Sequence, residues 1–168
     1  MILIALGANL PSDYGTPVDT LQAAMHALEL KGVEVVASSR IWLTAPVPFD
    51  PDQDWYHNSV VAVETKLSAS ELLDLMLSIE EEFGRVRTVK NAPRLLDLDL
   101  IAYHDQVIKE GDRLIVPHPK MSERLFVLKP LEDISENWVH PVTGHNIAKM
   151  LQDLPPGQEA KPIEGPPA

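Results

Sequence analysis

The amino-acid sequence predicts an α+β fold, a ferredoxin-like antiparallel sheet with helices packed on it. The main observation is the order of its segments: strand, helix, strand, strand, helix, strand, as in the ferredoxin-like motif. A second observation is size and composition. The chain has 168 residues, 45% of them apolar, which is enough to bury one hydrophobic core.

The first half of this order starts with residues 1–7, MILIALG, a continuous apolar run that ends at a glycine and is typical of a buried strand. Residues 16–19, TPVD, predict a helix start, because a capping hydroxyl, an early proline and a carboxylate each favour a helix N-terminus. This helix is expected to end at Gly32. The β-rich residues 33–42 then predict the second strand.

The second half follows a proline-rich loop at residues 43–58 and starts with a predicted strand, SVVAVET, at residues 59–65. Residues 68–71, SASE, have the pattern of a capping box and open a helix that is expected to end at Gly84. A polar, basic loop then leads to the last strand of the pattern, which ends at Tyr103.

The remaining residues are expected to add little regular structure. A short strand near residues 106–108 is predicted to form a hairpin with the strand before it, residues 111–130 read as irregular, and Ile147 lies in a last short helix. We expect residues 1–154 to form one domain. Residues 155–168, PPGQEAKPIEGPPA, are rich in Pro and Gly with little to bury, and are expected to form a flexible tail.

Charge and composition argue against several classes of partner. Lys plus Arg number 14 and Asp plus Glu 25, so the formal charge of −11 disfavours nonspecific binding to nucleic acid or anionic membranes. No segment approaches the roughly 20 apolar residues that span a bilayer, and the apolar start lacks a basic leader. The chain has no cysteine, which suits a reducing compartment, and we expect a cytoplasmic protein.

The segment RLLDLDL, residues 94–100, places two carboxylates close together. Side chains alternate along a strand, so Asp97 and Asp99 are predicted to project from one face while the leucines between and beside them face the core. Carboxylates this close repel one another unless a cation joins them. The same pattern occurs on ordinary solvent-exposed strands, so its interpretation as a metal site depends on the residues nearby.

Those neighbours are basic. Arg85, Arg87 and Arg94 lie just before the aspartates, and His118 follows between two prolines. Arginines bind phosphate oxygens in a bidentate manner, and Mg²⁺ prefers carboxylate and phosphate oxygens, so the combination is typical of a polyphosphate site. The alternatives are an ordinary surface loop for the arginines and a merely exposed histidine.

The loop at residues 43–58 concentrates aromatic side chains, and Tyr56 and Asn58 would share a face if the chain is extended there. An aromatic ring with an amide suits a flat heterocycle that has hydrogen-bonding edges. The alternative is that these aromatic residues anchor the core at the start of the next strand.

Four segments together resemble the family of 6-hydroxymethyl-7,8-dihydropterin pyrophosphokinases of folate biosynthesis: LGANL at 6–10, GRVR at 84–87, PRLLDLDL at 93–100 and VPHPKMSERLFVLKPL at 116–131. The resemblance runs from Met1 to about Leu154. It implies a ferredoxin-like fold arranged as a three-layer α/β/α sandwich. It also implies a monomer that uses Mg²⁺ (two ions) to transfer pyrophosphate from ATP to the hydroxymethyl group of a reduced pterin, releasing AMP.

The resemblance also implies roles for individual residues. Asp97 and Asp99 would bind both Mg²⁺ ions and, with Arg85 and Arg94, would carry catalysis. Positions that match ATP contacts are Glu80, Arg85, Arg94, Leu100, Arg113, His118 and Arg124. Positions that match the pterin pocket are Asn9, Thr44, Val47, Tyr56, Asn58 and Phe126, with the rings of Tyr56 and Phe126 on either side of the pterin.

Two other functions are compatible with the aspartate pair. One is a metal-dependent nucleotidyl transferase of palm-like fold, which also sets paired aspartates on a ferredoxin-like sheet. The other is a non-catalytic module that binds a nucleotide or a divalent ion. The charge of −11 and the absence of a long basic groove disfavour nucleic acid, whereas the aromatic loop favours a small ring as substrate.

Overall fold

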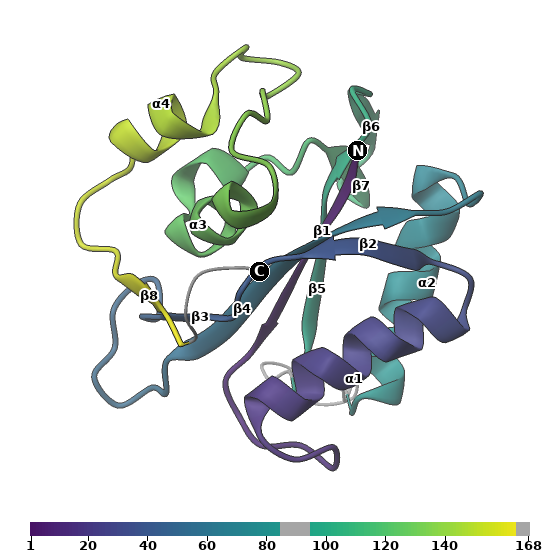
Figure 1. The fold of residues 1–168 in the computed structure, drawn as a ribbon, viewed down its shortest axis with the longest axis vertical. Helices are drawn as coiled ribbons and strands as arrows, with labels where there is room; N and C mark the ends of the chain where they lie inside the picture. The colour runs from purple at the N-terminus through teal and green to yellow at the C-terminus, as the bar shows by residue number, and fades with distance from the viewer. Residues whose placement is uncertain (85–94, 164–168) are drawn as a thin grey trace.

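The computed structural model describes residues 1–84 and 95–163 (Figure 1). Its strands are β1 (Ile2–Ala8), β2 (Glu34–Ser38), β3 (Trp42–Thr44), β4 (Tyr56–Glu64), β5 (Asp97–Tyr103), β6 (Ile108–Glu110), β7 (Leu114–Val116) and β8 (Ala160–Pro162). Its helices are α1 (Pro17–Leu30), α2 (Ala69–Glu82), α3 (Leu125–Ile134) and α4 (Ile147–Gln152), with a 3₁₀ turn at Met121–Glu123.

The main sheet is antiparallel and has the strand order β5-β1-β4-β3-β8, with β2 paired to the far end of β4. Helices α1 and α2 cover one face, and α3 and α4 lie on the other side of the sheet (Figure 1). The short strand expected near residues 106–108 is β6, but it pairs with β7 and not with β5, so β6 and β7 form a separate hairpin. The predicted α+β fold, an antiparallel sheet with helices packed on it, is confirmed.

Strand β1 lies in the middle of this arrangement and is buried along its whole length. Ile2, Ile4 and Leu6 pack into the core under α1 and α2, whereas Leu3 and Ala5 pack into a second core under α3 and α4. Because both faces of the strand are covered, every position can be apolar, and this explains the unbroken run MILIAL.

Both long helices start and end where the sequence predicted. Thr16 and Ser68 are the N-caps of α1 and α2, and each forms a complete capping box with the acidic residue three positions later. Gly32 and Gly84 follow the two helices with φ values of +88° and +101°, a backbone conformation that glycine adopts without steric cost. Within residues 1–84 and 95–163, no helix is long and apolar enough to cross a membrane.

The expectation of irregular structure at residues 111–130 is wrong in two places. Strand β7 pairs with β6, and helix α3 begins at Leu125 although Pro130 lies inside it. A proline cannot donate a helical hydrogen bond and normally marks a helix end, which explains why the sequence did not predict this helix. Its burial against β4 favours the helix, because Val127, Leu128 and Leu131 are fully buried there.

The segment from residue 155, expected to form a flexible tail, contains a short strand. Strand β8 pairs antiparallel with β3, and the ladder is extended by hydrogen bonds from Ala45 N to Glu159 O (3.1 Å) and from Ile163 N to Ile41 O (3.0 Å). The low apolar content of this segment suggested disorder, but pairing with a sheet edge satisfies main-chain groups and needs few apolar side chains. Residues 164–168 lie outside the described part of the chain.

Candidate active site

A cavity of about 310 Å³ opens on the α3 side of the sheet, where β1 ends and β4 and β5 begin. Its wall combines carboxylates, a histidine, an arginine, two aromatic rings and main-chain segments. The lining residues are Ala5, Leu6, Gly7, Thr44, Ala45, Val47, Tyr56, Asn58, Asp97, Asp99, His118, Arg124 and Phe126. Most of the residues that the sequence assigned to a site therefore meet in one place, although they come from five separate segments.

The two aspartates project into this cavity from neighbouring positions on one face of β5, as their spacing predicted. The leucines at 96, 98 and 100 are buried on the opposite face in the core under α1 and α2. The side chain of Asp99 is 42% exposed, and one of its oxygens lies 3.9 Å from Arg124 Nη1. The strand thus presents two carboxylates to the cavity while its other face fixes it to the core.

These carboxylates are suited to a hard divalent cation. Within the described ranges, no cluster of three His, Cys, Asp or Glu side chains is present that could hold a metal by itself. Mg²⁺ usually takes one or two protein carboxylates and completes its shell with water and substrate phosphate oxygens. A pair of aspartates at an open cavity therefore fits Mg²⁺ that arrives with a phosphate ligand.

His118 is fixed as a neutral hydrogen-bond donor beside the aspartates. Its amide donates to Ile101 O (2.9 Å), and its Nδ1 accepts from the Lys120 amide (3.1 Å), so the neutral ring carries its proton on Nε2. Burial lowers the His118 pKa; nearby Asp99 opposes this effect, and Arg124 and Lys120 reinforce it. At neutral pH, the ring can therefore donate a hydrogen bond without carrying charge.

The other end of the cavity is shaped for a flat polar ligand. Asn58 and Thr44 are buried, and Asn58 Nδ2 donates to Thr44 Oγ1 over 2.6 Å. Tyr56 stands two residues before Asn58 on the same face of β4, and Phe126 reaches the cavity from the first turn of α3. The Phe126 ring also lies under the Arg124 guanidinium, 5.3 Å from its centroid, which is a cation–π distance.

A smaller cavity, of about 190 Å³, adjoins the first beyond β5 and shares Asp99 and His118 with it. Leu100 and Arg113, two predicted ATP contacts, both line this second cavity. Arg113 Nη1 donates to Ser70 Oγ (3.0 Å), and its Nη2 forms an ion pair with Asp74, so α2 supports this wall. Asp99 and His118 therefore stand between two cavities.

Two predicted site residues, Glu80 and Asn9, lie outside the walls of these two cavities. Glu80 is buried on α2, and its Oε2 accepts the Leu98 amide (2.9 Å), so it holds β5 between the two aspartates. Asn9 is not part of the cavity wall; its side chain donates to Asp54 O (3.3 Å). Val47 does line the cavity but is 58% exposed. The predicted Arg85 and Arg94, with Arg87, lie outside the described residues.

Gly7 is a cavity residue that the sequence reading missed as an individual position. It pairs with Asn58 on one side and with Asp97 on the other. A Cβ atom built on Gly7 would lie 2.7 Å from Asn58 Oδ1, so only glycine fits beside this amide. The segment LGANL contained the signal, because it places a glycine near the end of an otherwise apolar strand. A glycine at such a position often marks a close approach of another group to the backbone.

Comparisons with known proteins agree with this geometry. A family model described as 7,8-dihydro-6-hydroxymethylpterin-pyrophosphokinase (HPPK) matches residues 3–136. A 2-amino-4-hydroxy-6-hydroxymethyldihydropteridine pyrophosphokinase from Synechocystis sp. is 40% identical over 153 residues, which cover 90% of this chain and 75% of that protein. A protein of the same name from Bacillus subtilis is 42% identical over 133 residues, covering 79% of this chain and 77% of that protein.

Some relatives are much longer. The folic acid synthesis protein fol1 of Pneumocystis carinii is 39% identical over 91% of this chain, which spans 20% of that protein. The wild-type HPPK-DHPS structure from Plasmodium falciparum matches with a TM-score of 0.68 and 15% identity, and the match covers 90% of this chain and 44% of that one. At this level of identity, the match supports only the similarity of the fold. With a family model across most of its length and bacterial relatives of similar size, this chain belongs to the 7,8-dihydro-6-hydroxymethylpterin-pyrophosphokinase family.

Proposed function

We propose that this chain transfers a pyrophosphoryl group from ATP to the hydroxymethyl group of 6-hydroxymethyl-7,8-dihydropterin and releases AMP, as a step of folate biosynthesis. The observation that carries the proposal is the position of Asp99 and His118, which line both cavities. A transfer between two bound molecules needs the groups that contact the transferred phosphoryl group at the boundary between the two sites. One cavity then takes the pterin and the other takes part of the nucleotide.

The reaction breaks one bond and forms another at the β-phosphorus of ATP. The pterin hydroxyl oxygen attacks this phosphorus, the bond to the oxygen of the α-phosphate breaks, AMP leaves and the hydroxyl proton passes to solvent. No side chain becomes covalent, so the contribution of the chain is alignment and charge stabilisation. His118 Nε2 and Arg124 would donate to phosphate oxygens at the boundary of the cavities.

Asp97 and Asp99 would hold two Mg²⁺ ions. When bound, these ions would neutralise the triphosphate and orient it for in-line attack. The carboxylates themselves are ready for this role, because β5 already presents both of them on one face of the cavity. Arg85 and Arg94 are proposed to stabilise the charge that develops on the leaving AMP.

The larger cavity is proposed to bind the pterin. Asn58 and Thr44 offer an amide and a hydroxyl to the edge of the heterocycle, and the rings of Tyr56 and Phe126 offer faces for stacking. The proposed pterin site also includes Asn9 and Val47. The proposed ATP site also includes Glu80, Leu100 and Arg113. We further propose that the chain acts as a monomer in the cytoplasm: the family resemblance implies a monomer, and the lack of cysteine suits a reducing compartment.

The test is AMP release from ATP, Mg²⁺ and the reduced pterin, with the pterin diphosphate as the second product. Asp97→Asn is expected to abolish turnover and to leave pterin binding measurable, because it removes one of the two proposed metal ligands and keeps the shape of the side chain. Asp105→Asn, an exposed turn position on the same segment of chain, is the matched control and is expected to behave as wild type. Release of ADP, release of AMP without pterin, or near-normal turnover of Asp97→Asn would contradict the proposal.

A further inference from the structure

Residues 158–160 connect two walls of the larger cavity. Gln158 Oε1 accepts the Leu125 amide hydrogen (3.0 Å), and its Nε2 donates to Glu123 O (2.8 Å). The next residues turn to the opposite wall, where Glu159 O accepts the Ala45 amide hydrogen and Ala160 pairs with Thr44. One short segment near the C-terminus thus binds both β3 and the start of α3.

The Gln158 side chain contacts the main chain on both sides of Arg124. Leu125 is the first residue of α3, so its amide has no acceptor within the helix, and the side chain of the N-cap residue Arg124 has only donors and cannot supply one. Gln158 supplies that partner from a distant part of the sequence. Arg124 is left free to point into the cavity, toward Asp99 and over the Phe126 ring.

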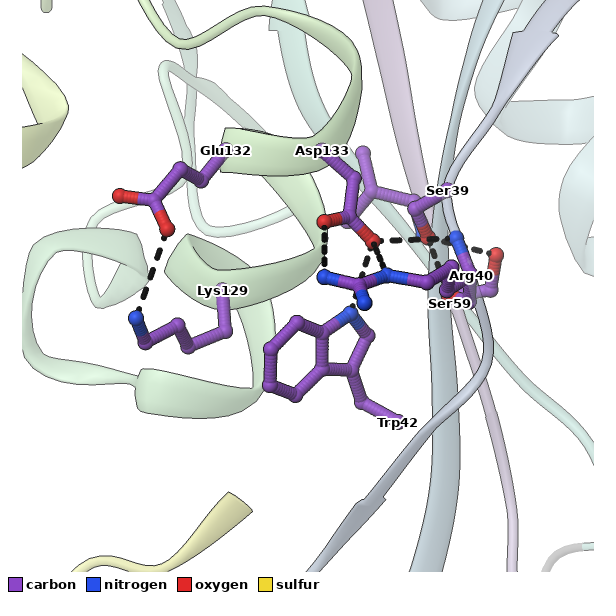
Figure 2. A network of polar contacts seen from close by, with 8 residues as sticks. Ser39, Arg40, Trp42, Ser59, Lys129, Glu132 and Asp133 are labelled. Carbon is purple, nitrogen blue, oxygen red and sulfur yellow. Dashed lines mark hydrogen bonds and ion pairs between the residues drawn. The ribbon is translucent and has the colours of Figure 1, made fainter. Parts of the chain in front are cut away.

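A second connection between β3 and α3 lies at the other end of α3. Figure 2 shows the Asp133 carboxylate accepting hydrogen bonds from Arg40 Nε and Nη2, from the Arg40 amide and from Trp42 Nε1. That network joins α3 to the start of β3 at the end of the helix remote from the cavity. The far end of the helix is therefore held by contacts that do not involve Gln158.

We propose that Gln158 is a positioning residue for Arg124, an inference that rests on the proposed function for its kinetic consequence. By holding Glu123 O and the Leu125 amide, Gln158 fixes the backbone of Arg124 and so directs its guanidinium toward the boundary of the two cavities. The segment that leads into β8 then contributes to the geometry of the active site.

The test compares Gln158→Ala with Gln158→Glu and with a matched control, Gln152→Ala, whose side chain is exposed at the end of α4. Gln158→Ala loses both hydrogen bonds and is expected to lower kcat/KM for AMP release about five- to tenfold. Gln158→Glu keeps an acceptor for the Leu125 amide but turns a carboxylate oxygen toward Glu123 O, so it should also lower kcat/KM. Gln152→Ala is expected to match wild type.

A double-mutant cycle with Arg124→Ala separates positioning from general stabilisation. If Gln158 acts through Arg124, Gln158→Ala should change kcat/KM less than about twofold in the Arg124→Ala background, because the group it positions is absent. A merely structural role would lower the midpoint of thermal unfolding and reduce kcat/KM by the same factor in both backgrounds. That result, or wild-type kinetics of Gln158→Ala, would overturn the proposal.

Hydrogen exchange tests the same contact without activity. The Leu125 amide is expected to be protected in wild type and in Gln152→Ala, and to exchange markedly faster in Gln158→Ala. If wild type releases no AMP, the proposed function fails, whereas the exchange result still decides whether Gln158 holds the first turn of α3. Unchanged protection in Gln158→Ala would refute the inference whatever the kinetics show.

Discussion

Replacing Gly7 by alanine tests the proposed pterin cavity with a single methyl group. The new Cβ would lie 2.7 Å from Asn58 Oδ1, which is closer than such contacts occur. Asn58 cannot move aside freely, because it is 7% exposed and its Nδ2 donates to Thr44 Oγ1 over 2.6 Å. The substitution should therefore displace the amide proposed to bind the edge of the pterin and should break a buried hydrogen bond.

The magnitude follows from that bond. Leaving a buried polar group without its partner costs about 1–3 kcal/mol. If the cost falls on the bound state, it corresponds to a loss of pterin affinity of roughly 5- to 150-fold. The affinity for the nucleotide should change much less, because the second cavity is lined by β5, α2 and the β7 region and does not include Asn58.

Isothermal titration of Gly7→Ala with the reduced pterin, in the presence of Mg²⁺ and a nonhydrolysable ATP analogue, measures the effect. Gly111→Ala is the control: Gly111 has φ +59° in the turn between β6 and β7, so alanine there strains the backbone and lowers stability without touching the cavity. Pterin affinity in Gly7→Ala equal to wild type, or an equal loss in Gly111→Ala, would show that the cavity does not bind the ring as proposed.

Two further predictions concern the carboxylates. Burial alone would raise the pKa of Asp133, but hydrogen bonds from Arg40 and Trp42 outweigh burial and lower it. Wild type should therefore have a higher free energy of unfolding in urea than Asp133→Asn, and the difference should be largest above about pH 4. It should decline as the pH falls through the lowered pKa of Asp133. A difference that grows toward acidic pH would refute the predicted direction. Chelation of Mg²⁺ should abolish AMP release but leave the thermal unfolding midpoint nearly unchanged, and a large fall would show that the ions support the fold.

The features that could be read from the sequence are those set by neighbouring residues. The caps at Thr16 and Ser68 act within one turn, and the orientation of Asp97 and Asp99 follows from strand alternation. The resemblance to the family then placed residues from remote segments, such as Tyr56, around the same cavity, and the structure brings most of them together.

The features that were missed depend on contacts between remote segments. Strand β8 is stabilised by the edge of β3, and Gln158 finds its partners at the start of α3, so neither can be inferred from the composition of a Pro- and Gly-rich tail. Helix α3 tolerates Pro130 because burial against the sheet outweighs one lost hydrogen bond. Glu80, which is proposed for the ATP site, also accepts the Leu98 amide with its carboxylate, and this contact between α2 and β5 was not predicted.

The interactions on the two faces of β5 explain why this strand tolerates two aspartates that lie two residues apart. Two carboxylates that face water repel one another by about 1 kcal/mol, whereas each buried leucine contributes about 1.5–3 kcal/mol. Leu96, Leu98 and Leu100 are buried on the opposite face, and a one-residue shift of the strand would exchange them for the aspartates. The core therefore fixes the carboxylates before any cation binds, and this is why we expect Mg²⁺ to govern the chemistry and not the folding of the chain.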